Sequence, residues 1–187
     1  DVYKRHVHFK LSKTNIEVVR PKARIEQRGR GISYQYFKAG LEVAGQSLDI
    51  IGLHFKANSS FRSSGRLKRP LKIDTNKFVE KQNLFARTKL SFSNAFKDPT
   101  YLREKLGYEV FAAAGLPTPG VGWAVVYLTI EGSQQRERIG FYTITEQIND
   151  KFLGRKLGKA SKKSLLMKPE GTSDWDYLGP EPARYVE

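Results

Sequence analysis

The chain has 187 residues, 39% of them hydrophobic, and its 33 Lys and Arg against 19 Asp and Glu give a formal net charge of +14. This apolar content is enough for a hydrophobic core, and the charge favours polyanionic partners such as nucleotides, nucleic acids, anionic lipids or acidic proteins. The absence of cysteine excludes disulfides and thiolate metal sites. No apolar run approaches the roughly 20 residues of a membrane helix. The sequence starts at Asp1 rather than Met, which leaves a removed leader open.

The N-terminal half of the chain predicts mainly strands. Apolar and polar residues alternate from His6 to Leu11, the period of a half-buried strand. Gly45 in Ala44-Gly45-Gln46 suits the positive φ of a tight hairpin turn. We expect a helix or turn at 15–21 and loops at 24–31 and 59–65. The predicted strands are residues 6–11, 34–43, 48–56, 71–74 and 88–92.

One principal helix is predicted from Asp98 to Ala114. Asp98 is a suitable N-cap, and Pro99 fits the first helical position, where its missing N–H has no consequence. Gly115 suits the residue after the C-cap. An apolar stripe at i, i+4 and i+8 predicts that the helix packs on a sheet through Leu102, Leu106 and Val110.

The C-terminal part predicts a second hairpin, residues 121–130 with 138–145, then a short helix at 149–157 and a strand at 165–167. The order of strands and helix is close to that of the small lobe of a protein kinase, an analogy at the level of the fold. We therefore expect an α+β fold, an antiparallel sheet with one main packed helix. The whole chain, 1–187, is expected to form a single, incomplete domain.

Five short segments give the chain a resemblance to a known family. They are Lys56-Ala57-Asn58-Ser59-Ser60, Lys68-Arg69-Pro70-Leu71-Lys72-Ile73, Arg103-Glu104-Lys105-Leu106, Ala112-Ala113-Ala114-Gly115-Leu116-Pro117 and Gly140-Phe141-Tyr142-Thr143-Ile144-Thr145-Glu146. In this order and spacing they resemble the spore-coat protein H (CotH) kinase family, over residues 6–185. The resemblance implies an atypical protein kinase that uses ATP and Mg²⁺ and acts on an unknown protein substrate. It implies an extracellular or cell-envelope location, such as the cell surface or spore coat, and leaves a cytoplasmic location open.

The resemblance also implies that this sequence corresponds to the N-terminal half of such a kinase. Family members carry their catalytic and metal-binding aspartates beyond the position that matches Glu187. We therefore assign no catalytic residue and no metal ligand, and we expect residues 1–187 alone to be inactive in phosphoryl transfer. Three possibilities are left open: the sequence is a fragment of a longer kinase, it pairs with a second chain, or it is a non-catalytic relative.

The nucleotide phosphates are expected at the serine-rich loop and the lysines that follow it. Asn58, Ser59 and Ser60 are candidates for cradling phosphate oxygens, although an ordinary surface turn remains the alternative. This chain has Ala57 where the family usually has Gly, which leaves the conformation of the loop open.

Strand parity brings two lysines to one side of the following strand. Leu71 and Ile73 are expected to face the core, so Lys68 and Lys72 face the opposite side. Lys68 matches the basic pair of the family and is the first choice for a phosphate contact, with Arg62 or Lys72 assisting. The alternative for each of these residues is a solvated surface charge.

Two carboxylates complete the predicted site. Glu104 is a candidate partner for Lys68 or Lys72, as in kinase lobes, or else a surface residue of the helix. Glu146 stands where a hinge begins and is a candidate for binding a nucleotide hydroxyl or amine, or it simply ends a strand. His6 and His8 lack a third metal ligand with suitable spacing, and Asp174 and Asp176 are interpreted as loop residues.

The alternative function comes from the charge alone: a basic module that binds an anionic polymer or surface, such as a nucleic acid or an acidic protein. It requires cations spread over a broad face, whereas a nucleotide site requires them to converge. The candidate stripe is Lys22, Arg24, Arg28, Arg30, Lys156, Lys159, Lys162 and Lys163.

Overall fold

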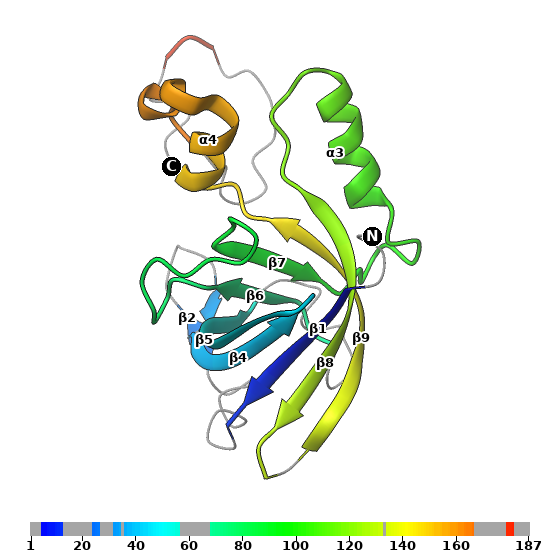
Figure 1. Ribbon diagram of the computed structural model, residues 1–187. Helices are drawn as coiled ribbons and strands as arrows, with labels where there is room; N and C mark the ends of the chain where they lie inside the picture. Colours follow the sequence, from blue (N-terminus) through cyan, green and yellow to red (C-terminus); the bar gives the residue numbers. More distant parts are fainter. Residues whose placement is uncertain are drawn as a thin grey trace.

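The computed structural model describes residues 5–12, 24–26, 32–34, 36–56, 68–132, 134–166 and 179–181. Its main feature is a closed β-barrel, and two short helices rise from one end of it (Figure 1). Going round the barrel, the described strands are β1 (Arg5–Leu11), β4 (Phe37–Val43), β5 (Gln46–Phe55), β6 (Leu71–Asp74), β7 (Lys89–Ser93), β9 (Gln134–Glu146) and β8 (Val121–Ile130).

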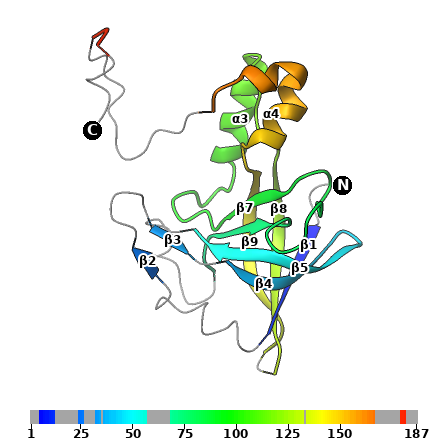
Figure 2. The same ribbon diagram turned by 90° about the vertical axis from the view of Figure 1, so that its left-hand side faces the viewer.

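The barrel is closed by a parallel pairing between β1 and β8, in which Val7 lies opposite Val126. The other neighbouring strands of the barrel pair antiparallel. A separate two-stranded sheet, β2 (Arg24–Glu26) and β3 (Ile32–Tyr34), lies beside the barrel (Figure 2). The expected loop at 24–31 is therefore wrong for Arg24–Glu26, while residues 27–31 lie outside the described part of the chain.

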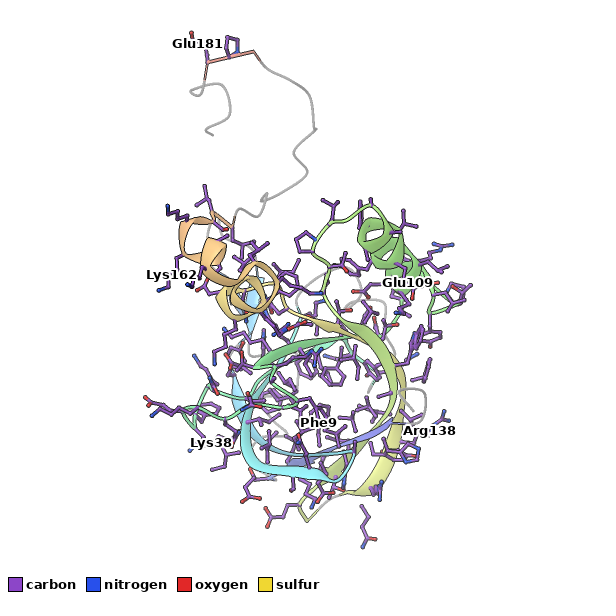
Figure 3. All side chains as sticks on the ribbon, turned by 45° about the horizontal axis from the view of Figure 1, so that its top comes forward. Phe9, Lys38, Glu109, Arg138, Lys162 and Glu181 are labelled. Carbon is purple, nitrogen blue, oxygen red and sulfur yellow. The ribbon has the colours of Figure 1, made fainter. Side chains whose placement is uncertain are left out.

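The hydrophobic core fills the inside of the barrel. Phe9 is fully buried there, as Figure 3 shows, and its ring meets the ring of Phe92 edge-on at 5.5 Å between centroids. Phe92 in turn lies 6.5 Å from the ring of the buried Tyr142, whose hydroxyl donates to the Arg69 carbonyl. Small barrels are filled by their own inward side chains in this way. The strands thus form the core without any helix packed on a sheet.

The two helices, α3 (Arg103–Ala113) and α4 (Asp150–Leu157), stand above one end of the barrel, and the 3-10 helix η2 (Gly158–Lys163) follows α4 (Figures 1 and 2). No residue of α3 is buried. The three predicted contact residues are 45% to 68% exposed: Leu102, Leu106 and Val110. Both the packed helix and the α+β kinase small lobe are therefore wrong as predictions, since the described fold is mostly a closed barrel.

The distribution of apolar residues around α3 explains why the predicted packing of this helix was wrong. Leu106 and Val110 lie on one side of the helix, but Tyr108 and Phe111 lie on the opposite side, because successive residues are about 100° apart. The helix therefore has no single apolar face. Counting only the i, i+4, i+8 positions overlooked the apolar residues between them.

The predicted end of α3 is correct and its predicted start is too early. Gly115 has a φ of +81° and donates to the Ala112 carbonyl, and Leu116 donates to the Phe111 carbonyl at 3.0 Å. This is the paired bonding of a Schellman cap. At the other end Asp98 lies before the helix, yet its carboxylate accepts from the Arg103 N–H at 2.9 Å. Hydrogen bonds from Thr100 and from Arg103 hold the pKa of Asp98 below its usual value.

The two predicted hairpins are present. Ala44 and Gly45 both have positive φ between β4 and β5, the conformation of a type I′ turn. β8 has the predicted bounds, and β9 begins four residues earlier than expected. α4 is capped by Asn149, whose side chain accepts from the Phe152 N–H. The predicted strand at 165–167 is wrong at Leu165 and Leu166, which lie in no strand. Residue 167 lies outside the described chain, as do 15–21 and 59–65.

Candidate functional site

The outer surface of β6, β7 and β9 carries several of the predicted site residues. On β6, Leu71 and Ile73 are 5% and 0% exposed and belong to the barrel core. Side chains alternate along a strand, so Lys72 between them faces outward. The predicted parity of this strand is confirmed.

A row of three residues crosses this outer surface. Lys72 pairs with Ser91 of β7, and Ser91 pairs with Thr145 of β9. Neighbouring strands lie about 4.8 Å apart, so the Lys72 backbone is about 10 Å from that of Thr145. The Thr145 hydroxyl donates to Glu104 Oε1 at 2.6 Å, and so brings the first turn of α3 to this row. Lys72 and Glu104 therefore belong to one surface, although they are far apart in sequence.

Lys68 lies over the same surface, closer to the middle of β9. Its ammonium donates to the Tyr101 hydroxyl, and its aliphatic chain lies against Gly140, where an added Cβ would meet Lys68 Cδ at 3.0 Å. The Tyr101 ring also contacts Phe141 edge-on at 5.0 Å. The Lys68 carbonyl accepts from Asn94 at 3.1 Å. Lys68 is thus held by a tyrosine, and its predicted approach to Glu104 stays a prediction.

His54 borders the row on β5, directly opposite Lys72. Burial lowers the pKa of His54 from 6.5 to about 4, and the positive charge of Lys72 contributes to this shift. The imidazole stacks in a tilted geometry on the Tyr36 ring, 4.2 Å between centroids. Burial and Asp74 raise the pKa of Tyr36 to about 12. At neutral pH the neighbour of Lys72 is therefore an uncharged ring, so His54 adds no second positive charge beside Lys72.

The remaining phosphate-binding candidates, Asn58, Ser59, Ser60 and Arg62, lie outside the described residues. Their flanks are described: the Lys56 N–H donates to the Pro70 carbonyl at 3.0 Å. The two ends of segment 57–67 are therefore adjacent at one end of β5 and β6. The following lysine, Lys68, belongs to the same end.

Glu146 occupies a different place from the other candidates. It is 5% exposed, and its carboxylate accepts a hydrogen bond from Arg155 of α4 and lies 3.6 Å from Arg87 Nε. A buried carboxylate requires such compensation. Sequence reasoning missed both arginines, because no local spacing connects Arg87, Glu146 and Arg155. The expected contact of Glu146 with a nucleotide stays a prediction, and the structure gives this residue two cationic partners.

The histidines of β1 and the basic stripe were the other candidates, for a metal site and for polyanion binding. His8 is buried and hydrogen-bonded to Glu42 at 3.2 Å and to Thr129 at 2.7 Å, while His6 is exposed. Within the described ranges, no three His, Asp or Glu side chains are placed to hold a metal ion. Of the basic stripe, the exposed members in the described chain are Lys156, Lys159, Lys162 and Lys163. Arg24 belongs to β2, and residues 22, 28 and 30, like the aspartates at 174 and 176, are not described.

No helix in the described part of the chain is long and apolar enough to cross a membrane. Comparison with protein families matches residues 42–183 to the family described as CotH kinase protein. The match includes β5 to β9, both helices and the whole outer surface described above. The chain therefore belongs to the CotH kinase family, a family of kinase-like proteins. No curated protein matches the chain.

Proposed function

We propose that this chain is the nucleotide-binding portion of a CotH-type kinase and that it holds the phosphates of Mg-ATP on the outer surface of β6, β7 and β9. The observation that carries the proposal is the row Lys72–Ser91–Thr145, with Glu104 of α3 bonded to Thr145. In this arrangement a cation from a strand and a carboxylate from a helix share one face, next to the ends of the serine-rich segment.

Each group has a defined task in this proposal. Lys72 and Lys68 act as compact positive charges for phosphate oxygens, and the carboxylate of Glu104 orients a lysine from the side. Thr145 fixes Glu104, so that its carboxylate does not have to be ordered when the nucleotide arrives. Binding that uses preorganised groups loses less conformational entropy. Asn58, Ser59, Ser60 and Arg62 add hydrogen bonds from the serine-rich segment.

The proposal extends to activity and location by way of the family. Phosphoryl transfer needs a metal-bridged nucleotide and a base that orients the acceptor. We assign no catalytic or metal-binding aspartate within these 187 residues, so we expect transfer of the γ-phosphate by residues 1–187 at background level. The acceptor is a protein of unknown identity, at the cell surface or spore coat.

The test is a titration of residues 1–187 with Mg-ATP by isothermal calorimetry. Lys72→Met and Lys68→Met remove the two charges while keeping most of the aliphatic chain, and Lys10→Met is the matched control, since Lys10 is exposed on β1 on the other side of the barrel. We expect one saturable site in the wild type and a loss of about tenfold or more in affinity in Lys72→Met, since a hydrogen bond to a charged group contributes about 1.5–3 kcal/mol. Equal affinity in Lys72→Met, Lys68→Met and Lys10→Met would contradict the proposal.

A second candidate function has an observation of its own. Four exposed lysines within α4 and η2 form a short basic segment, and Figure 3 shows Lys162 projecting from it. The placement of these lysines in one segment favours the binding of a polyanion. Such binding weakens steeply with salt, because neutralised phosphates release counterions. A steep salt dependence that disappears in Lys159→Met/Lys162→Met/Lys163→Met, and persists in Lys72→Met, would favour this function instead.

A further inference from the structure

The end of the barrel below the two helices contains an apolar cavity of ≈ 300 Å³. This volume is at the small end of the range for ligand pockets. The cavity reaches into the barrel, where its walls are aliphatic and aromatic: Val7, Leu41, Val43, Leu90, Phe92 and Ile144. An apolar space of this kind is poorly suited to water, which needs polar partners, and binds apolar groups instead.

A tight turn covers one side of the cavity and fixes a cation at its rim. Leu84 and Arg87 exchange two backbone hydrogen bonds, of 2.8 and 3.0 Å, and the two residues between them have positive φ. Leu84 and Phe85 line the cavity. Arg87 Nη1 donates to the Phe85 carbonyl at 2.9 Å, which holds the guanidinium at the rim.

A second cavity of ≈ 340 Å³, lined by residues of α3, α4 and the barrel, lies next to the first. The two cavities share four residues: Arg87, Gly120, Val121 and Glu146. The outer cavity is basic. Arg87 and Arg155 share the single carboxylate of Glu146, and Lys156 adds a further positive charge, while Lys105 is paired with Glu109 at 2.7 Å.

We propose that this end of the barrel binds a single-chain amphiphile with an anionic head group. The apolar chain lies in the inner cavity, and the carboxylate or phosphate head lies in the outer cavity against Arg87, Arg155 and Lys156. A nucleobase fits less well, because the inner walls would leave its polar edge without hydrogen bonds. The site is separate from the outer surface of β6, β7 and β9, so the inference goes beyond the proposed nucleotide function.

The test uses ligands that differ in one feature at a time. Decanoate and decyl phosphate carry the two anionic heads, and decanol and decyltrimethylammonium carry the same chain with a neutral or cationic head. All are titrated by calorimetry into residues 1–187, below the concentration at which they form micelles. We expect one site per chain for an anionic ligand and at least tenfold weaker binding of the neutral and cationic ligands. The preferred head identifies a carboxylate or a phosphate as the natural group.

The length of the ligand's alkyl chain tests the cavity without any mutation of the protein. From hexanoate upward, each added methylene is expected to raise the affinity about threefold to fourfold until the cavity is full, and no further beyond that length. Affinity that keeps rising with length would show unspecific adsorption and overturn the proposal, as would equal binding of all four head groups.

Two variants locate the site. Val121→Trp fills the junction of the cavities, and Arg87→Met removes the rim cation; we expect a loss of tenfold or more in decanoate affinity in each. Arg136→Met, an exposed site near Tyr127, is the control, and each variant is first checked for a wild-type circular dichroism spectrum. Lys72→Met should bind decanoate like the wild type, which separates this test from that of the nucleotide site. Unchanged affinity in both Val121→Trp and Arg87→Met, or full displacement of decanoate by ATP, would overturn the proposal.

Discussion

Thr145 and Glu146, consecutive residues at the end of β9, each hold a different helix. The Thr145 hydroxyl donates to Glu104 of α3 at 2.6 Å, and the Glu146 carboxylate accepts from Arg155 of α4. Because side chains alternate along a strand, Thr145 belongs to the outer surface and Glu146 to the open end of the barrel. One short segment thus contacts both helices, of which α3 has no buried residue and α4 buries Phe152.

The ion pairs of Glu146 are expected to stabilise this end of the molecule. Arg155→Met leaves the buried carboxylate with Arg87, at 3.6 Å, as its remaining cationic partner among the described residues. It should lower the free energy of unfolding by about 3 kcal/mol, the lower limit for breaking a buried pair, because Arg155 is partly exposed. Urea denaturation measures the change. Lys151→Met, an exposed site on the same helix, is the control and should stay within about 0.5 kcal/mol of the wild type.

Removing both partners of this pair should be milder than removing the arginine alone. In Glu146→Gln/Arg155→Met no buried charge is left, so the double variant is expected to be more stable than Arg155→Met. A double variant that is destabilised by the sum of the two single changes would show that Glu146 and Arg155 act independently.

Because the apolar side chains of α3 are exposed, shortening them is expected to have little effect on the free energy of unfolding. Leu106 is 53% exposed, so Leu106→Ala should cost less than about 1 kcal/mol, since surface changes have small effects and Ala favours helix. Phe92 is 1% exposed in the barrel core, and Phe92→Ala should cost about 3–5 kcal/mol. Chemical denaturation of both variants compares them. A larger loss in Leu106→Ala would mean that α3 packs through its apolar residues after all.

His54 is expected to make stability depend on pH. Its pKa is about 4 in the folded chain against 6.5 ordinarily, so between these values the unfolded chain takes up a proton that the folded chain does not. Stability is therefore complete above pH 6.5 and falls as the pH drops toward 4, with a slope of at most about 1.4 kcal/mol per pH unit for one proton. Urea midpoints from pH 7 to pH 4.5 measure this fall.

The variant His54→Phe should remove that part of the pH dependence, since phenylalanine keeps a ring against Tyr36 without titrating. His6→Phe, at an exposed histidine, serves as the comparison and should follow the wild type. If His54→Phe loses stability toward acid as steeply as the wild type, other groups are responsible.

Local patterns predicted the elements better than their assembly. The hairpin at Gly45, the cap at Gly115 and the inward direction of Leu71 and Ile73 follow from residues close together in sequence, and all are confirmed. Closure of the barrel depends on β1 pairing with β8, more than a hundred residues later. No turn or spacing marks a parallel pairing between distant strands. For that reason the sequence predicted an antiparallel sheet with one main helix packed on it.

Local patterns likewise predicted only part of the candidate site. Parity placed Lys72 on the outer surface, and the structure adds Ser91 and Thr145 as the residues that connect it to Glu104. Those connections depend on strand register, which the sequence pattern does not specify between strands separated by a long excursion. The arginine partners of Glu146 are equally invisible in sequence, since charged residues are common in this chain.

The most direct test of the central claim is a nuclear magnetic resonance titration of ¹⁵N-labelled residues 1–187 with Mg-ATP. We expect the amide signals of Lys72, Ser91 and Thr145 to shift together along one saturation curve, and Lys72→Met to weaken the binding that all three signals report. Shifts confined to α4 and η2, around Lys159 and Lys162, with the signals of Lys72, Ser91 and Thr145 unmoved, would contradict it.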